Sequence, residues 1–152
     1  MLPPDLRQTL VTVAQAMRDA RDPWWVISSA AVALHGVAAV KVADVDVVTS
    51  VEDARRVMAR LGVGPAKESA SLMFRSTVFG QWKAPPLMVE IMAGFHVATS
   101  AGWTEVLPRT RVPIGVEEAT IYVPRRDELA EILRLFGRPK DDERIRLLTT
   151  QP

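Results

Sequence analysis

Hydrophobic and polar positions follow two different periods along this chain. Between residues 6 and 17 apolar side chains recur every three or four residues, the period of an amphipathic helix. Between residues 42 and 49 valines alternate with Asp44 and Asp46, the period of a half-buried strand. The same patterns, read together with capping and breaking residues, predict further helices over 30–35, 51–61, 128–136 and up to about residue 148, and further strands at 24–27, within 72–82, and at 87–92, 112–114 and 120–123.

Capping residues and breaks refine these boundaries. Ser50 and Asp127 are the expected N-caps of the helices 51–61 and 128–136. The segment 72–82 is expected to form one or two short strands around Gly80. Residues 62–71 read as a polar connection, and residues 94–109 as irregular or briefly helical.

The order of these elements predicts one α/β (α+β) domain over residues 1–152, with a mixed β-sheet flanked by helices. A chain of 152 residues has the common size of one domain and can bury a sizeable core. We find no internal repeat or low-complexity linker that would divide it.

Composition and charge exclude several classes of function. The net charge of +1 gives no overall field that would attract nucleic acid or an anionic membrane. The absence of cysteine excludes disulfides and thiolate chemistry, which fits a reducing compartment. The start of the chain lacks the basic and apolar regions of a signal peptide, and no apolar run reaches the roughly 20 residues of a membrane span. We therefore expect a cytoplasmic protein with no membrane partner.

The most informative chemistry lies at Asp44 and Asp46. Strand side chains repeat every two residues, so both carboxylates should lie on one face. Hard oxygen ligands of this kind select Mg²⁺ or Mn²⁺ over zinc. Glu90 lies inside the apolar run 87–92, where a buried charge is costly without a partner or a metal, so it is the candidate third carboxylate. The alternative reading is a solvated strand face with no metal.

The chain resembles the nucleotidyltransferase superfamily with the polymerase-beta-type palm. The resemblance rests on a strand, turn and helix over 24–36, the Asp-x-Asp strand over 44–48, and a later strand bearing Glu90. The tail over 133–142, with Gly-Arg-Pro-Lys-Asp at 137–141, is similar to the end of small bacterial members, including those related to abortive-infection toxins. Together these motifs cover most of the chain.

The resemblance implies a magnesium-dependent transfer of a nucleotidyl group from a nucleoside triphosphate to a hydroxyl acceptor, whose identity the sequence leaves unknown. In that reading Asp44, Asp46 and Glu90 bind Mg²⁺ or Mn²⁺ and carry catalysis, with Glu90 assisting deprotonation of the acceptor. The nucleotide-binding candidates, which would hold phosphates or neutralise their charge, are Ser28, Ser29, Lys41 and Lys140. We expect the three acids to converge at the edge of the sheet, on the face opposite most helices.

Two other functions stay open. Ser28 stands where the family usually places a glycine that lets backbone amides approach a triphosphate. This departure favours a catalytically degenerate module that binds a nucleotide or a protein partner, and a homo-oligomer is equally compatible with the chain. An exposed apolar patch over residues 82–88 would instead indicate a purely structural subunit.

The remaining candidate residues have structural readings beside the functional ones. His35 is expected to cap or pack at a helix end rather than act as a base. His96 follows the strand that bears Glu90, so it could face the metal cleft. Trp24 and Trp25 are read as core residues rather than a stacking platform. The basic residues Arg125, Arg126, Arg138 and Lys140 either hold a phosphate or lie at solvated helix ends.

Overall fold

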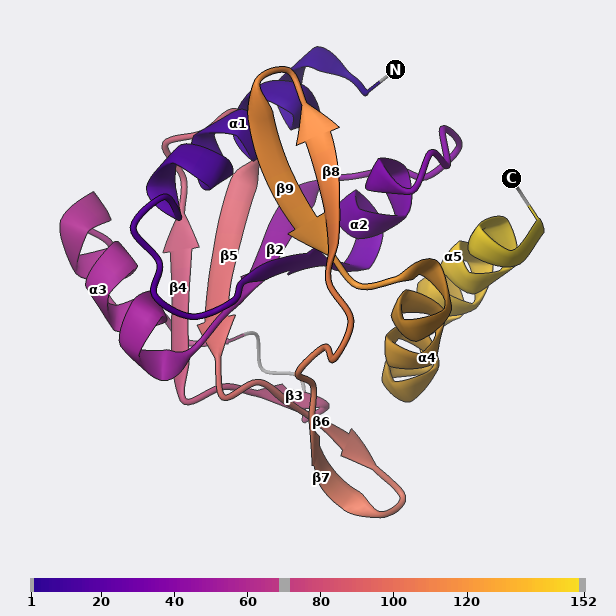
Figure 1. Ribbon diagram of the computed structural model, residues 1–152. Coiled ribbons are helices and arrows are strands. Elements are labelled where there is room, and N and C mark those ends of the chain that lie inside the picture. Colours follow the sequence, from indigo (N-terminus) through magenta and orange to yellow (C-terminus); the bar gives the residue numbers. More distant parts are fainter. Residues whose placement is uncertain (1, 69–71, 151–152) are drawn as a thin grey trace.

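The computed structural model describes residues 2–68 and 72–150 of the chain. The expected connection 62–71 therefore lies partly outside the described residues. The elements follow one another in the order α1 (Pro4–Ala16), β1 (Trp25–Ile27), α2 (Ser28–Leu34), β2 (Asp44–Val48), α3 (Val51–Leu61), β3 (Phe74–Arg75), β4 (Val78–Trp82), β5 (Met88–Ala93), β6 (His96–Thr99), β7 (Gly102–Glu105), β8 (Val112–Val116), β9 (Ala119–Val123), α4 (Arg126–Phe136) and α5 (Pro139–Thr150) (Figure 1).

The central sheet has four strands in the order β1-β2-β5-β4. Strand β2 pairs antiparallel with β1 and parallel with β5, and β4 pairs antiparallel with β5. The sheet is therefore mixed, as the sequence predicted. The acid-bearing strands β2 and β5 are its two central strands, so the expectation of a site at the edge of the sheet is wrong.

One face of this sheet is covered by α3. Val47 and Ile91 are partners in the register and are buried, and Gly80 pairs with Ile91 on the next strand. A Cβ on Gly80 would lie 2.5 Å from the terminal methyl of Met58 on α3, so this glycine allows the helix to approach closely. Gly80 thus lies within β4, and the segment 72–82 forms the two short strands β3 and β4, in agreement with the sequence prediction. Since strand side chains alternate between faces, Asp44, Asp46 and Glu90 lie on the opposite face.

The first helix begins at Pro4 and turns its apolar stripe inward. Leu6, Leu10 and Val13 are almost fully buried. The helix packs against the two-stranded ribbon β8–β9, which runs alongside it in Figure 1. The hydroxyl of Thr9 accepts a hydrogen bond from the Leu87 amide at 3.0 Å and so joins α1 to the start of β5.

The C-terminal helix pair is joined to a second small sheet. Strands β3, β6 and β7 form this sheet, and the β6–β7 hairpin projects from the molecule at the bottom of Figure 1. Phe74, Phe95 and Phe136 make ring contacts at centroid distances of 5.1–6.0 Å, which pack α4 against this sheet. The hairpin occupies most of the segment 94–109, for which the sequence predicted irregular or briefly helical structure, so that prediction is wrong.

Helix α4 begins at Arg126, and its N-cap is Arg125, which makes no side-chain capping bond. The prediction of Asp127 as the N-cap is therefore wrong. Asp127 lies in the first turn of the helix, where its carboxylate accepts a hydrogen bond from the Glu128 amide. Glu128 itself is buried and accepts hydrogen bonds from the amides of Arg109 and Thr110, each at 2.8 Å. Burial alone would raise the pKa of Glu128, but the hydrogen bonds from this loop outweigh it and lower that pKa.

The buried apolar residues form a core cluster that extends from α1 to α5. Trp82, Leu87 and Met88 are half-buried and packed in this structure rather than exposed, so the apolar patch that would indicate a structural subunit is not formed. Within the residues the structure describes, no helix combines the length and the apolar character needed to span a membrane.

Candidate metal centre

Three carboxylates meet on the open face of the central sheet. Asp46 and Glu90 are direct partners in the parallel register of β2 and β5, and Asp44 lies two residues before Asp46 on the same face. Each of the three residues offers one oxygen, and these oxygens all lie within 4.8 Å of one another. All three side chains are half-buried. The predicted convergence of Asp44, Asp46 and Glu90 is confirmed.

The cluster carries more negative charge than its surroundings balance. Burial raises the pKa of Asp46 from 3.8 to about 8, and the carboxylates of Asp44 and Glu90 add to the shift. The hydroxyl of Ser28 forms a hydrogen bond with Asp46 and opposes the shift without cancelling it. The protein without metal therefore holds a proton at Asp46 near neutral pH.

The donors fit a divalent cation. Oxygen Oδ1 of Asp46 is buried and has no hydrogen-bond partner within the described residues, although buried polar atoms are nearly always satisfied. A cation shared by the three carboxylates would satisfy this oxygen and relieve the mutual repulsion. Hard carboxylate oxygens, without thiolate or imidazole ligands in the cluster, suit Mg²⁺ or Mn²⁺.

Two residues that the sequence reasoning missed lie beside Glu90. Gln81 of β4 pairs directly with Glu90, and its Nε2 donates to Oε2 of Glu90 at 3.2 Å. Glu68, in the connection after α3, is close enough for the charge of Glu90 to contribute to its pKa, which burial raises. Gln81 is a polar residue in the otherwise apolar run 78–82, which could have marked it in the sequence. Its link to the site, however, follows only from the register that pairs it with Glu90.

Ser28 and Ser29 lie at the N-terminal end of α2, directly after β1, as predicted. They do not cap a helix that starts at residue 30, however, because they form the first turn of α2 and its N-cap is Ile27. Both are buried, with 6% and 3% of their surface exposed. The backbone of Ser28 has a φ of +61°, in the left-handed region that glycine adopts most easily. The turn therefore keeps the conformation of a glycine although its residue is serine, and the hydroxyl that serine adds is directed to Asp46. Phosphate binding by these serines stays a prediction.

Lys41 and Lys140 lie on different elements and both are exposed. Lys41 belongs to the loop that precedes β2, and Lys140 lies in the first turn of α5. Their contact with a nucleotide stays a prediction. Arg138, in contrast, is held by the buried carboxylate of Asp141 at 2.6 Å and lies over the rings of Phe74 and Phe136, which indicates a structural role.

The other candidate residues have structural partners. His35 is the C-cap of α2, its Nε2 lies 2.8 Å from the carbonyl of Pro124, and burial lowers its pKa. Arg126 donates to the carbonyl oxygens of His35 and Leu148, each at 2.6 Å, and so joins α4 to α2 and α5. Arg125 is exposed and pairs with Asp127.

The tryptophans and the second histidine lie outside the acid cluster. Trp24 and Trp25 are buried, with the ring of Trp24 packed edge-on against Tyr122 at 5.3 Å and Nε1 of Trp25 donating to the carbonyl of Thr110. Both are core residues, as expected. Nδ1 of His96 lies 2.8 Å from the carbonyl of Gly94, and the metal-ligand group found among the described residues contains carboxylates alone. His96 therefore is not part of it.

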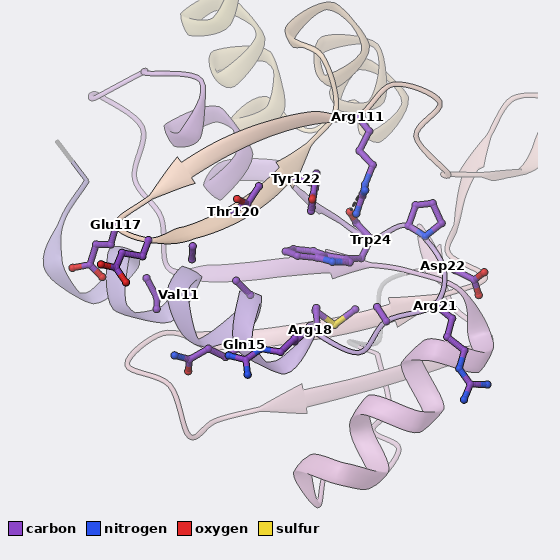
Figure 2. A pocket seen from close by; sticks show the side chains of 16 residues that line it. Val11, Gln15, Arg18, Arg21, Asp22, Trp24, Arg111, Glu117, Thr120 and Tyr122 are labelled. Atoms are coloured by element: carbon purple, nitrogen blue, oxygen red, sulfur yellow. Dashed lines mark hydrogen bonds between the residues drawn. The ribbon is translucent and has the colours of Figure 1, made fainter.

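A pocket of about 1000 Å³ lies away from these acids, between α1 and β9. Figure 2 shows Trp24 and Tyr122 inside it, with Arg111 extending along the Tyr122 ring and Glu117 at the far end. None of the three clustered carboxylates lines this pocket. Its volume therefore says nothing about the acid cluster.

Solved structures resemble this fold over almost the whole chain. A candidate nucleotidyltransferase from Thermotoga maritima superposes with a TM-score of 0.76 at 22% identity, covering 100% of this chain and 97% of its own. The lincosamide antibiotic adenylyltransferase LnuA, with lincomycin bound, gives 0.59 at 11% identity over 93% of this chain and 94% of its own. The antibiotic-resistance factor ANT(2'')-Ia gives 0.60 at 12% identity over 95% and 83%.

No family model matches the sequence, and no curated protein matches it. The structural likeness nevertheless shows the fold: the chain has the nucleotidyltransferase fold that the sequence resemblance implied. Within that fold, the two central strands of the sheet present the three carboxylates on its open face.

Proposed function

We propose that this protein is a magnesium-dependent nucleotidyltransferase that moves a nucleotidyl group from a nucleoside triphosphate to a hydroxyl acceptor. The observation that carries the proposal is the carboxylate cluster on two central strands, with a buried Asp46 oxygen that has no partner within the described residues. The nucleotidyltransferase fold around the cluster supports the same reaction class.

Each carboxylate has a distinct role in the proposal. Asp44 and Asp46 hold the metal, because they share a strand face and Asp46 has the unsatisfied oxygen. Glu90, from the neighbouring strand, shares the metal with them and accepts the proton of the acceptor hydroxyl as the oxygen attacks the α-phosphorus and pyrophosphate leaves. Bound Mg²⁺ would supply Lewis-acid stabilisation of the charge that develops on the phosphate oxygens.

The remaining residues would contribute to nucleotide binding. Ser28 and Ser29, at the start of α2, would lie beside the phosphates, with Ser28 also holding Asp46 in place. Lys41 and Lys140 are exposed and have long, mobile side chains that would neutralise phosphate charge.

A degenerate binding module is the second candidate, and Ser28 is the observation that favours it. A serine at a φ of +61° places a Cβ where a glycine would leave space for a phosphate. In this reading the fold retains a nucleotide or partner surface without turnover. A protein that binds nucleotide and metal but releases no pyrophosphate with any acceptor would have this function.

A thermal-shift experiment tests the proposal directly. The parent protein is melted with each nucleoside triphosphate, with and without Mg²⁺, because a ligand that binds only the folded state must raise its stability. We expect a shift that requires Mg²⁺ and is absent in Asp44→Asn. A parent that shows no shift with any nucleotide and Mg²⁺ would contradict the proposal.

Activity is then measured as pyrophosphate release from the nucleotide that gives the shift. The structures similar to this one include LnuA with lincomycin and ANT(2'')-Ia with adenylyl-2''-tobramycin. ATP with lincomycin or tobramycin is therefore the first donor and acceptor set to test. Glu90→Gln should weaken the magnesium-dependent shift and also lose pyrophosphate release, because in this proposal Glu90 both shares the metal and accepts the proton.

A further inference from the structure

Gln81 is an uncharged neighbour of Glu90, the carboxylate that strand β5 contributes to the cluster. It lies on β4, directly opposite Glu90 in the antiparallel register with β5, and shares the open face of the sheet. Directly opposed residues of an antiparallel pair have Cβ atoms about 4.5–5.5 Å apart. That separation lets the Gln81 side chain reach Oε2 of Glu90, to which Nε2 donates at 3.2 Å.

The position of Glu90 matters because it shares a small site with two other carboxylates. Asp44 and Asp46 lie with it in one group whose oxygens are within 4.8 Å of one another. A hydrogen-bond donor on β4 fixes the place of the Glu90 carboxylate within this group. An arginine or lysine would hold it too, but would form an ion pair that competes with a metal, whereas an amide donates without removing the negative charge.

The hydrogen bond also gives the two carboxylate oxygens of Glu90 different roles. An ionised carboxylate can only accept, so the amide of Gln81 must present its NH₂ group, which fixes its orientation. With Oε2 occupied by Gln81, the other oxygen, Oε1, is left for a metal or for the proton of an acceptor hydroxyl.

We propose that Gln81 is a positioning residue that holds Glu90 through Oε2 and keeps Oε1 directed into the carboxylate cluster. This role rests on the metal-binding function proposed above. Partners of metal-ligating side chains typically contribute about 10-fold to 100-fold to metal affinity. Gln81 is such a partner, supplied by the strand on the far side of Glu90 from the aspartates.

The test uses Mn²⁺ alone, titrated into the full chain and followed by the electron paramagnetic resonance signal of free Mn²⁺. Gln81→Met keeps the length of the side chain and removes the donor. We expect it to raise the Kd for Mn²⁺ by about 10-fold or more, with little change in the melting temperature of the metal-free protein. Gln15→Met, on the exposed side of α1, is the matched control and should bind Mn²⁺ like the parent.

The outcomes separate the two proposals. If the parent binds Mn²⁺ and Gln81→Met binds it equally well, the role of Gln81 is overturned and the metal site stands. If the parent binds no Mn²⁺, both are overturned. A lower melting temperature with unchanged Mn²⁺ affinity would show that Gln81 only stabilises the sheet.

A second test uses the parent protein alone, so it does not require that a Gln81 variant folds. In a crystal structure of the parent with Mn²⁺, we expect Nε2 of Gln81 to remain within hydrogen-bond distance of Oε2 while Oε1 contacts the ion. A Gln81 side chain turned away from Glu90 in that structure would overturn the proposal.

Discussion

Asp46→Asn is the substitution that tests the electrostatics of the cluster most directly. In the folded protein the pKa of Asp46 is raised from 3.8 to about 8, so the folded state binds this proton more tightly than the unfolded chain does. The stability that the protonated form provides is complete below pH 3.8 and is lost as the pH rises toward 8. Asparagine carries no charge at any pH and removes this dependence.

The size of the effect follows from the shift. One pKa unit corresponds to about 1.4 kcal/mol, so at pH 7 the upper bound on the stabilisation by Asp46→Asn is about 4 kcal/mol. Side-chain relaxation and water entry reduce this value, and we expect a gain of about 1–4 kcal/mol. For a chain of this length each kcal/mol raises the melting temperature by about 2–4 °C.

The assay is urea unfolding of the metal-free protein at pH 5, 6, 7 and 8, with EDTA present. The difference between variant and parent should grow with pH, by at most about 1.4 kcal/mol per pH unit. Asp19→Asn is the matched control, because Asp19 is exposed and its ion pair with Arg60 at 3.3 Å is a surface pair. It should change stability little and equally at each pH.

Two results would refute the reasoning about Asp46. A variant that is no more stable than the parent would show that the carboxylate is not strained by its neighbours. A gain that is the same at pH 5 and pH 8 would show that the stabilisation does not come from the proton. Added Mg²⁺ should stabilise the parent and leave Asp46→Asn nearly unchanged, and an equal Mg²⁺ shift in both would remove Asp46 from the metal site.

Three further substitutions test the packing and the buried charges of the fold outside the cluster. Gly94→Ala should destabilise the fold by about 2–4 kcal/mol in urea unfolding, because Gly94 has a φ of +61° and a Cβ would lie 2.8 Å from that of Thr77. Glu128→Gln should cost about 1–3 kcal/mol at pH 7. Because the pKa of Glu128 is lowered from 4.5, the parent should lose this contribution as the pH falls below 4.5, whereas the variant should show a flatter acid limb in pH-dependent unfolding. Asp141→Asn should lower stability by about 3 kcal/mol, since it removes the charge of a buried carboxylate that pairs with the half-buried Arg138 and Arg144, and hydrogen exchange should show the loss in α5.

The sequence was sufficient to predict those features that depend on local pattern. The alternation around Asp44 and Asp46 placed both carboxylates on one strand face, and the strand, turn and helix at 24–36 formed as expected. The single charge in the run 87–92 identified Glu90 as a third acid. These predictions succeeded because they depend on a few neighbouring residues: the two-residue period of a strand and the free-energy cost of burying a charge.

Features that depend on the order of strands in the sheet could not be predicted from the sequence. The parallel pairing of Asp46 with Glu90 joins strands far apart in the chain, and nothing local fixes which strands are central. The site was therefore expected at an edge, and Gln81 was overlooked because its importance follows only from its register with Glu90. The β6–β7 hairpin was missed because its exposed strand residues show no clear alternation.

The backbone at Ser28 restricts which residues can occupy that position. A residue at a φ of +61° suits glycine, and asparagine and aspartate tolerate it better than most others, whereas β-branched residues are strongly disfavoured. Glycine would relieve the backbone but lose the hydroxyl beside Asp46, and aspartate would add a fourth negative charge to the cluster. Selection for folding alone should therefore enrich glycine at this position in a library of variants, while selection for metal binding should retain serine or asparagine. The difference between the two enriched sets would measure how far this position serves the cluster rather than the fold.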